Sequence, residues 1–463
     1  MQTASRAISD RECAMRVVLA GGGSAGHIEP ALALADALRE ADKSIEVTIL
    51  GTPRGLESRL VPLRGYPLEL IPAVPLPRSA TPQLITVPAR LARAAHAAGK
   101  VLDKAQADVL VGFGGYAATP AYLAAKRHGV PIVVHEANPF AGLANRIGAR
   151  LTSYVFTSQP DTKLRGAKYL GLPIRRQIAD LDRFALGDKA RAHFGLRPDL
   201  PVLLVFGGSQ GAKSLNRALG GAIGAIRDAG VQVLHVTGPK NAGDAPASDS
   251  PLTAGAAKSG AVPYVTLPYV DRMDLAYAAA DFALCRAGAM TCAELTAVGL
   301  PAAYVPLPIG NGEQRLNALP IVQRGGGLLV EDAELTADWI KHTLLPVLTN
   351  IDQVAGMSEA AAAMGRKDAD RWLAKAVIEI AATERASKTA SRATPGWGEP
   401  AASPLPRPPA PASQPAAEQP GSLFTPRGTR HAAPGGRPQA PATRAQPPGS
   451  QPAPGGGRHR HAR

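Results

Sequence analysis

The chain has 463 residues, of which 45% are hydrophobic and 19% are charged, and its formal net charge is +14. This length exceeds one ordinary hydrophobic core and predicts two domains with additional segments. The absence of any apolar run of about 18 residues excludes a membrane-spanning helix, and three cysteines without pairing or ligand spacing argue against a disulfide framework or a zinc site.

The positive charge is concentrated near the end of the chain. Residues 385–463 hold 11 Arg or Lys against two Glu, so +9 of the +14 belongs to this segment, which also carries 17 of the 43 prolines. Such a composition cannot bury enough apolar surface to offset the ordering entropy, and we expect residues 385–463 to be a disordered tail. Residues 1–14 lack the apolar stretch of a signal peptide and form a predicted extension, with Met15 as an alternative start.

Short apolar runs alternate with helical patterns over most of the chain. Strands are predicted at residues 16–20, 45–50, 109–111, 132–134 and 154–156, with helices at 29–40 and 119–128. The alternation restarts with strands at 202–206, 231–236, 262–267, 282–285 and 302–305 and helices at 212–228, 273–280 and 291–298. Strands that alternate with helices predict parallel sheets in α/β layers.

We therefore predict an α/β protein with two Rossmann-like domains that face a cleft. The first would span residues 15–172 and the second residues 173–384, with the join near residues 171–175. A last helix, at about 369–382, is compatible with either domain. Because ligands of open α/β sheets bind beyond the carboxyl ends of the strands, the active site is expected in the cleft.

A glycine-rich turn opens each series of strands. Residues 21–27 (GGGSAGH) follow the first strand, and residues 207–211 (GGSQG) follow strand 202–206. Glycines let the backbone approach a ligand and the next helix offers free N–H groups, which suits an anionic or polyhydroxylated group; the alternative is a tight turn without a ligand. Neither loop has the Lys of a Walker loop, which disfavours ATP hydrolysis, and neither combines the full G-x-G-x-x-G spacing with a well-placed ribose acid, which disfavours a dehydrogenase.

Polar residues follow the next two strands of the first domain. Residues 114–116 (GGY), 135–138 (HEAN) and 142–145 (GLAN) would lie at one edge of the first sheet. His135, Glu136 and the two asparagines can bind sugar hydroxyls and assist proton transfer. A hydrogen-bonded structural role is the alternative for His135.

The longest cluster lies in the second domain, at residues 285–294 (CRAGAMTCAE), 299–301 (GLP) and 312–317 (GEQRLN). A strand end leads there into a helix whose start carries Thr291 and Glu294. The Glu294 carboxylate can accept hydrogen bonds from ribose hydroxyls, and the helix start favours its ionised form; helix capping is the alternative.

In this order, the motifs resemble the MurG family, two-domain GT-B enzymes of glycosyltransferase family 28 that transfer N-acetylglucosamine in peptidoglycan synthesis; the resemblance covers about residues 15–382. It implies that the second domain binds the donor UDP-GlcNAc, that the first binds a lipid-linked muramyl-pentapeptide, and that no cofactor is needed. Val270 would meet uracil, Glu294 the ribose, and Ser209 the region of the phosphates. The other donor contacts that the resemblance implies are Ser24, Ala25, Gly26, Asn138, Arg175, Ala289, Met290, Thr291, Cys292, Ala293 and Gln314.

The implied reaction is a single displacement, in which the C4 hydroxyl of the acceptor attacks the anomeric carbon and UDP leaves with inversion. Backbone N–H groups and a helix dipole can stabilise the departing pyrophosphate without a metal. The D-x-D patterns at residues 180–182 and 368–370 do not follow a strand of the nucleotide half, so no essential metal is expected. His27 is the first candidate for the general base, because the ordinary pKa of His lies near working pH, and His135 and Glu136 are its rivals.

A lipid-linked acceptor implies contact with a membrane. Residues 74–100 combine apolar and basic side chains, namely Val74, Leu76, Leu84, Ile85, Val87 and Leu91 with Arg78, Arg90, Arg93 and Lys100. This mixture favours shallow insertion into an anionic surface, and an amphipathic helix packed on the first sheet is the alternative. We expect a peripheral location at the cytoplasmic face of the plasma membrane, proteins of cell-wall synthesis or division as partners, and no nucleic acid.

Three other functions fit part of the sequence. A glycosyltransferase for a diacylglycerol or a natural product would share the fold, although residues 135–145 match the peptidoglycan enzymes on the acceptor side. A UDP-GlcNAc 2-epimerase would need acid and base carboxylates that we do not find. A non-catalytic RNA- or membrane-binding protein would depend on the basic tail, so that deleting the tail would abolish its function.

Overall fold

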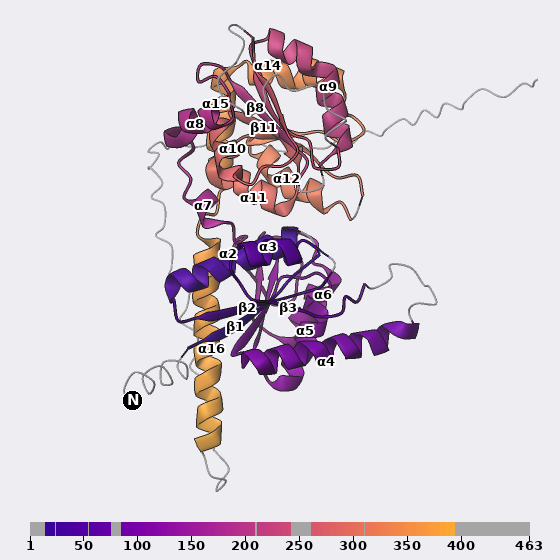
Figure 1. Ribbon diagram of the computed structural model, residues 1–463, viewed down its shortest axis with the longest axis vertical. Helices are drawn as coiled ribbons and strands as arrows, with labels where there is room; N and C mark the ends of the chain where they lie inside the picture. Colours follow the sequence, from indigo (N-terminus) through magenta and orange to yellow (C-terminus); the bar gives the residue numbers. More distant parts are fainter. Residues whose placement is uncertain are drawn as a thin grey trace, which may run out of the picture. The chain divides into compact units, whose positions relative to one another are not determined.

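The protein is described from a computed structural model, over residues 14–23, 25–53, 55–75, 85–208, 211–241, 261–309 and 311–393 (Figure 1). Several predictions fall outside these ranges. They concern the extension up to residue 13, the donor contacts Ser24 and Ser209, and the tail beyond residue 393. Both sheets described below belong to one compact unit.

The first sheet has seven parallel strands in the order β3-β2-β1-β4-β5-β6-β7. Strand β1 pairs with β2 on one side and β4 on the other, so that Leu19 lies between Ile49 and Val111. The strands are β1 Arg16–Ala20, β2 Glu46–Gly51, β3 Leu68–Leu70, β4 Val109–Gly112, β5 Ile132–Glu136, β6 Val155–Thr157 and β7 Ala167–Tyr169.

The second sheet repeats this design with six parallel strands in the order β10-β9-β8-β11-β12-β13. Its strands are β8 Val202–Phe206, β9 Gln232–Val236, β10 Tyr264–Leu267, β11 Phe282–Arg286, β12 Ala302–Val305 and β13 Gly327–Leu329. In each sheet the first strand of the series lies between the second and the fourth, which is the Rossmann arrangement. The predicted fold class is confirmed.

Helices cover both faces of each sheet. We call the first sheet with α2–α6 the first lobe and the second sheet with α7–α15 the second lobe. The helices of the first lobe are α2 Ala25–Ala41, α3 Glu57–Leu63, α4 Val87–Ala105, α5 Ala118–His128 and α6 Leu143–Leu151. Those that follow are α7 Arg176–Ala179, α8 Arg183–His193, α9 Lys213–Asp228, α10 Met273–Ala279, α11 Ala289–Val298, α12 Glu313–Gln323, α13 Ala337–Trp339, a π-helical turn Ile340–Leu344, α14 Leu345–Leu348, α15 Ile351–Ala362 and α16 Ala369–Ala393.

The strands are apolar along their whole length because both of their faces are covered. All five residues of β8 are buried, and its side chains contribute to cores on both faces of the second sheet. In the first lobe, α2 covers one face and α4 with α5 the other. This continuous burial is typical of parallel sheets between helical layers.

The last helix returns to the first lobe, where α16 packs against α2 (Figure 1). Leu373, Val377 and Ile380 are buried there in the same core as α2. The helix also continues past residue 385, into the segment that we predicted to be disordered, and this part of the prediction is wrong. An ion pair between Arg385 and the half-buried Asp108, directly before β4, holds this part of the helix against the sheet.

Arg176 joins the two chain segments that connect the lobes, one between β7 and α8 and the other between α15 and α16. Its guanidinium pairs with Asp180 at 2.7 Å, with Asp370 at 3.3 Å and with Asp368 at 3.7 Å. Asp182 caps α8 by accepting hydrogen bonds from two backbone N–H groups. All four carboxylates of the D-x-D patterns therefore have structural partners.

The segment that we predicted to touch a membrane contains the amphipathic helix α4. Val74, Val87 and Ala94 form a small buried core with Leu91 beside it, and α4 packs extensively against α5. The apolar face of α4 is thus used inside the first lobe, whereas Ile85, just before the helix, is exposed. Leu76, Arg78 and Leu84 lie outside the described residues.

None of the helices in the described part of the chain combines the length and the apolar character that crossing a bilayer requires.

Candidate functional site

The glycine-rich loops lie at the switch points of the two sheets. The loop after β1 is next to the loop after β4, and the loop after β8 is next to the loop after β11, because these strands are neighbours. At such a point the connections from adjacent strands diverge and leave a crevice for a ligand. The predicted site residues of each lobe therefore share the carboxyl edge of its sheet.

Glu57, a residue that was not predicted, fixes the first glycine loop. Its buried carboxylate accepts hydrogen bonds from the Gly23 N–H at 2.9 Å, from the Thr52 N–H at 3.0 Å and from the Thr52 hydroxyl at 2.9 Å. A Cβ atom on Gly22 would lie 2.5 Å from a Glu57 oxygen, so the loop approaches this carboxylate as only glycine can. The loops after β1 and β2 are thereby held together.

His27 lies in the first turn of α2, beside the loop after β4. Gly114 has a φ of +94°, and a Cβ atom there would lie 3.2 Å from Cδ2 of His27. Burial lowers the pKa of His27, while a hydrogen bond with the Gly22 backbone and the charge of Glu57 oppose this shift. The helix N-terminus also disfavours a cationic ring. His27 is therefore neutral near pH 7, which is the form that a general base needs.

The carboxylate of Glu136 organises the loop that follows β5. It accepts hydrogen bonds from the backbone N–H groups of Asn138 and Gly142, both at 2.9 Å, and from the Asn145 side chain at 3.0 Å. Asn145 in turn accepts from the Tyr122 hydroxyl at 2.8 Å. Burial raises the pKa of Glu136, against the effect of these hydrogen bonds. Through these contacts, Glu136 positions the loop that follows β5.

His135 is fully buried at the end of β5. Its Nε2 lies 2.8 Å from the Gly171 carbonyl oxygen, in the segment that leads to the second lobe. Nδ1 is buried and has no hydrogen-bond partner among the residues that the structure describes. Burial lowers the pKa of His135 to about 4. The ring thus ties the predicted acceptor loop to the inter-lobe segment, and it has no exposed nitrogen for a substrate.

A second buried histidine supports the glycine loop of the second lobe. His235 on β9 lies 3.0 Å from both the Asn216 and Tyr264 side-chain oxygens, and Asn216 donates to the Thr237 carbonyl at 3.1 Å. A Cβ atom on Gly211 would lie 2.4 Å from that same carbonyl oxygen. Burial lowers the pKa of His235 to about 4.

These two histidines predict acid sensitivity. In the unfolded chain the pKa of each is near 6.5, but in the folded chain it is about 4. Between these pH values the unfolded chain binds more protons than the folded chain, so the folded state loses stability as the pH falls. We expect the free energy of unfolding to fall between pH 6.5 and 4 by up to about 3 kcal/mol for each histidine. Urea unfolding at a series of pH values measures this dependence. His235→Gln should flatten it, and a wild-type dependence without this slope would contradict the prediction.

The donor-side cluster is centred on the start of α11. Glu294 is buried, and its Oε1 accepts from Nε and Nη2 of Arg175 at 3.2 and 2.9 Å. Its Oε2 accepts from the Tyr277 hydroxyl at 2.9 Å. Arg175, on the segment between the lobes, also interacts with the half-buried Glu29 of α2. Partial burial raises the pKa of Glu29, and the charge of Arg175 opposes this shift. One guanidinium thus faces carboxylates of both lobes.

The start of α12 completes this edge of the second sheet. Gln314 accepts a hydrogen bond from the Leu307 N–H at 3.0 Å, which fixes the loop after β12. Asn317 donates to the Ala287 carbonyl at 3.1 Å and accepts from Gln159 of the first lobe at 3.2 Å. Gln159, a direct contact between the lobes, was not predicted, because no local pattern marks it.

The remaining predicted contacts lie at the same two edges. Val270 follows β10 and is buried in one core with Tyr277 and Cys292. Asn138 is half-buried, and its amide groups bond to Glu136. Ala25 and Gly26 begin α2, while Ala289, Met290, Thr291 and Ala293 lie in the first half of α11. The positions of Ser24 and Ser209 are outside the described residues.

A cavity of about 490 Å³ lies between the lobes. From the first lobe it is lined by Ala137, Gln159 and Tyr169, among others, and from the second by α11 and α12. Of the predicted donor contacts, Ala289, Cys292 and Ala293 line it. The cavity thus reaches the start of α11, where the free N–H groups of a helix can bind anions.

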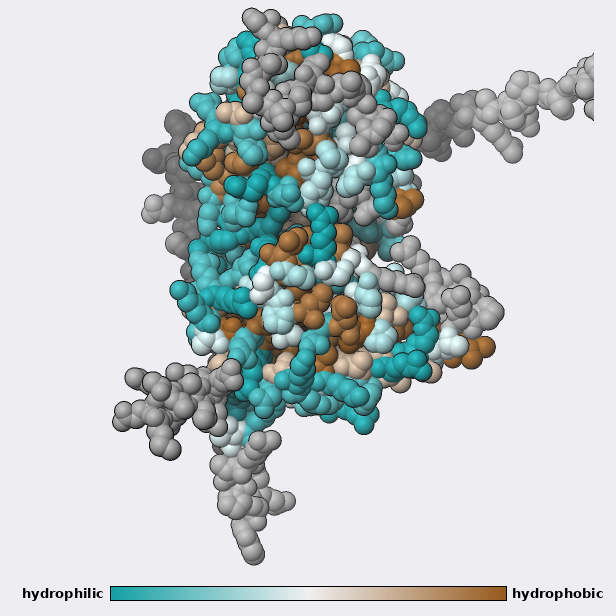
Figure 2. Space-filling view, in the orientation of Figure 1, coloured by the Kyte–Doolittle hydropathy of each residue, from teal (hydrophilic) through white to brown (hydrophobic). Residues whose placement is uncertain are grey.

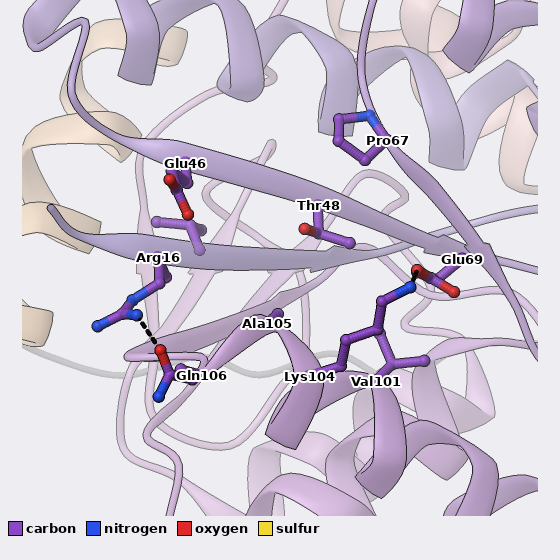
Figure 3. Close-up of a pocket in the computed structure, with 10 residues that line it drawn as sticks. Arg16, Glu46, Thr48, Pro67, Glu69, Val101, Lys104, Ala105 and Gln106 are labelled. Atoms are coloured by element: carbon purple, nitrogen blue, oxygen red, sulfur yellow. Dashed lines mark hydrogen bonds and ion pairs between the residues drawn. The ribbon is translucent and has the colours of Figure 1, made fainter. Parts of the chain in front are cut away.

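Figure 3 shows another cavity, of about 310 Å³, at the amino-terminal part of β1 and β2 beside α4. Arg16 contacts Gln106 there, and Lys104 donates to Glu69 at 2.6 Å. Because ligands of open α/β sheets bind at the carboxyl ends of the strands, we do not assign this cavity to the site.

Among the residues that the structure describes, no group of three or more His, Cys, Asp or Glu side chains is arranged to hold a metal ion.

Comparison with known proteins identifies the architecture. Residues 17–157 match the glycosyltransferase family 28 N-terminal domain, and residues 202–373 match the family 28 C-terminal domain. The chain is 63% identical over 371 residues to a protein of Thermobifida fusca and 61% identical over 372 residues to one of Streptomyces avermitilis. These matches cover 80% of this chain and 96% and 100% of the relatives. Both relatives are named UDP-N-acetylglucosamine–N-acetylmuramyl-(pentapeptide) pyrophosphoryl-undecaprenol N-acetylglucosamine transferase.

Solved structures agree with this comparison. MurG of Acinetobacter baumannii aligns with a TM-score of 0.59 and 26% identity, over 79% of this chain and 99% of that protein. A UDP-GlcNAc 2-epimerase of Neisseria meningitidis aligns with a TM-score of 0.55 and 14% identity, over 79% of this chain and 100% of that protein. The second likeness is one of fold alone.

Proposed function

Because this chain belongs to glycosyltransferase family 28, with MurG transferases among its relatives, we propose that it transfers N-acetylglucosamine from UDP-GlcNAc to the C4 hydroxyl of undecaprenyl-pyrophosphoryl-MurNAc-pentapeptide, with inversion. The observation that carries this proposal is 63% identity to a relative of that name over 96% of the relative's length. The proposal is supported by the glycine loops, His27 and the Glu294 cluster, which lie at the carboxyl edges of the sheets, where ligands of open α/β sheets bind.

We assign the donor to the second lobe. The starts of α9 and α11 offer N–H groups and the positive ends of helix dipoles for the pyrophosphate, and Glu294 is the proposed acceptor for ribose hydroxyls. Val270 is proposed at the uracil, and Arg175 and Gln314 at the donor near the cleft. Negative charge that develops on the departing UDP would be stabilised by these fixed dipoles.

We assign proton removal to His27. In the displacement, the acceptor oxygen forms a bond to the anomeric carbon, the bond from that carbon to the UDP oxygen breaks, and the hydroxyl proton passes to the neutral imidazole. The half-buried side chain of His27, in the first turn of α2 beside the loop after β4, suits this role. His135 and Glu136 would position the acceptor loop, because their hydrogen bonds already go to protein groups.

We further propose that the first lobe touches the membrane surface that holds the lipid acceptor. Figure 2 shows hydrophobic side chains on the visible face of this lobe, and Leu63, Ile85, Phe140 and Leu143 are among its exposed apolar residues. Apolar side chains near basic ones suit shallow binding to an anionic surface. Contact with cell-wall synthesis or division proteins is part of the same proposal.

The membrane contact predicts a specific variant. Ile85→Glu should weaken binding to vesicles that contain anionic phospholipid, because it places a negative charge at an exposed apolar position. Co-sedimentation with such vesicles measures the change, with Ile351→Glu on the second lobe as the control, since Ile351 is equally exposed there. Equal binding by the two variants would contradict the assignment to the first lobe.

The function itself is tested by transfer of radiolabelled GlcNAc to a short-chain lipid-linked muramyl-pentapeptide, together with release of UDP. Transfer that requires both substrates would support the proposal. Folded protein that binds UDP-GlcNAc but transfers no sugar to this acceptor would overturn the acceptor assignment, and protein that does not bind the donor would overturn the donor as well.

A further inference from the structure

Tyr277 is a buried tyrosine whose hydroxyl group has no part in the reaction described above. It lies on α10 and is 1% exposed, and its ring packs near Phe206, with 6.1 Å between the ring centroids. Phe206 is the last residue of β8, directly before the glycine loop of the second lobe. The hydroxyl of Tyr277 donates to Oε2 of Glu294 at 2.9 Å.

The donors around Glu294 leave little of its carboxylate unused. A carboxylate offers about four lone-pair directions, two on each oxygen. The two N–H groups of Arg175 occupy Oε1, and the Tyr277 hydroxyl takes one direction on Oε2. The remaining lone pair, which could accept a hydrogen bond from an incoming hydroxyl, is therefore on Oε2, the oxygen that already accepts from Tyr277.

Burial also fixes the direction of this hydrogen bond. The pKa of Tyr277 lies well above its ordinary value, first because of burial and then because of the charge of Glu294, so the phenol keeps its proton. A protonated phenol beside a carboxylate donates, and the bond to an ionised acceptor is stronger than a neutral one. Arg175 comes from the inter-lobe segment, whereas Tyr277 comes from the packed interior of the second lobe.

We propose that Tyr277 is a positioning residue for nucleotide recognition, which orients Oε2 of Glu294 toward a ribose hydroxyl of the donor. The inference rests on the proposed function, because it takes the ligand of Glu294 to be the ribose of UDP-GlcNAc. It adds a residue that acts through Glu294 and that touches neither the sugar nor the nucleotide.

The test compares Tyr277→Phe with the wild type in calorimetric binding of UDP, 2′-deoxy-UDP and 3′-deoxy-UDP. We expect wild-type protein to bind at least one deoxy analogue about tenfold more weakly than UDP, because that analogue lacks a hydrogen bond to a charged group. In Tyr277→Phe, UDP binding should weaken about threefold to tenfold. The ratio between UDP and the sensitive deoxy analogue should shrink at the same time.

Tyr304→Phe is the matched control. Tyr304 is also fully buried in the second lobe, but its hydroxyl has no hydrogen-bond partner in the part of the chain that the structure describes. This variant should keep both the UDP affinity and the preference for the full ribose. Thermal unfolding of both variants checks that each is folded.

The outcomes separate the inference from the proposed function. The positioning role would be overturned if Tyr277→Phe binds UDP and both deoxy analogues more weakly by the same factor, or if it keeps the wild-type preference for UDP. A wild type without any preference among the three nucleotides would also overturn it. Because this binding assay contains no acceptor, failure to transfer sugar leaves the result intact, whereas a wild type that binds no UDP contradicts the donor assignment.

Discussion

A His27→Ala variant is expected to lose about 10²- to 10⁴-fold in kcat, which is the usual contribution of a positioned general base. The donor should still bind within a few-fold of the wild type, because the donor contacts that we propose come mainly from the second lobe. Steady-state kinetics of GlcNAc transfer, with calorimetric binding of UDP, measures both quantities. An unchanged kcat would remove His27 from the reaction.

The pH profile gives an independent test of the same residue. Because burial lowers the pKa of His27, the acid limb of the wild-type kcat/KM profile should lie below pH 6.5, with activity lost as the imidazole is protonated. His27→Ala should lack this limb. His128→Ala is the control, since His128 is an exposed histidine at the end of α5 that bonds to Asp103 at 2.8 Å, away from the glycine loops.

Replacing Glu294 by alanine should impair both donor binding and stability. The change leaves the guanidinium of Arg175 and the hydroxyl of Tyr277 without their shared acceptor. Breaking such a buried pair costs about 3 kcal/mol, at the lower end of its usual range because Glu29 still faces Arg175. Loss of a charge-assisted bond to the ribose should lower kcat/KM for UDP-GlcNAc by about 10- to 100-fold.

Urea unfolding and sugar-transfer kinetics separate these two effects. Glu294→Gln preserves the shape of the side chain and removes its charge, so it should retain more stability than Glu294→Ala while still binding the donor poorly. Donor kinetics of Glu294→Ala that match the wild type, in protein that is folded, would contradict a ribose contact. The stability loss would then stand alone as the role of this carboxylate.

Strands that are buried on both faces were predictable from the sequence. Strands β1, β8 and β12 have the predicted bounds, because short apolar runs there end at glycine or proline. The edge strands β3, β7 and β13 were missed. Each has only three residues, and β3 and β7 include a charged side chain while β13 begins with glycine, so the pairing of these strands depends on a neighbouring strand more than on their own sequence.

The positions of the predicted site residues followed from strand ends, but their partners did not. Tyr277 and Arg175 are far from Glu294 in the sequence, so no local pattern predicts that they contact it. Only the folded sheet brings these groups together. Glu57 was also not predicted, because a glutamate at the start of a short helix is common and does not by itself indicate a contact with a glycine loop. The sequence also could not predict what the apolar face of α4 contacts, because an amphipathic pattern is the same whether that face packs on a sheet or on lipid.

The return of α16 to the first lobe has a consequence for biosynthesis. Leu373, Val377 and Ile380 cover α2, so the core of the first lobe includes residues that the ribosome adds only after the whole second lobe. Domains of most proteins fold in the order in which they are made. Here a nascent chain that already contains all seven strands of the first sheet still exposes the part of α2 that α16 later covers. The lobe that is translated first is therefore the one completed last.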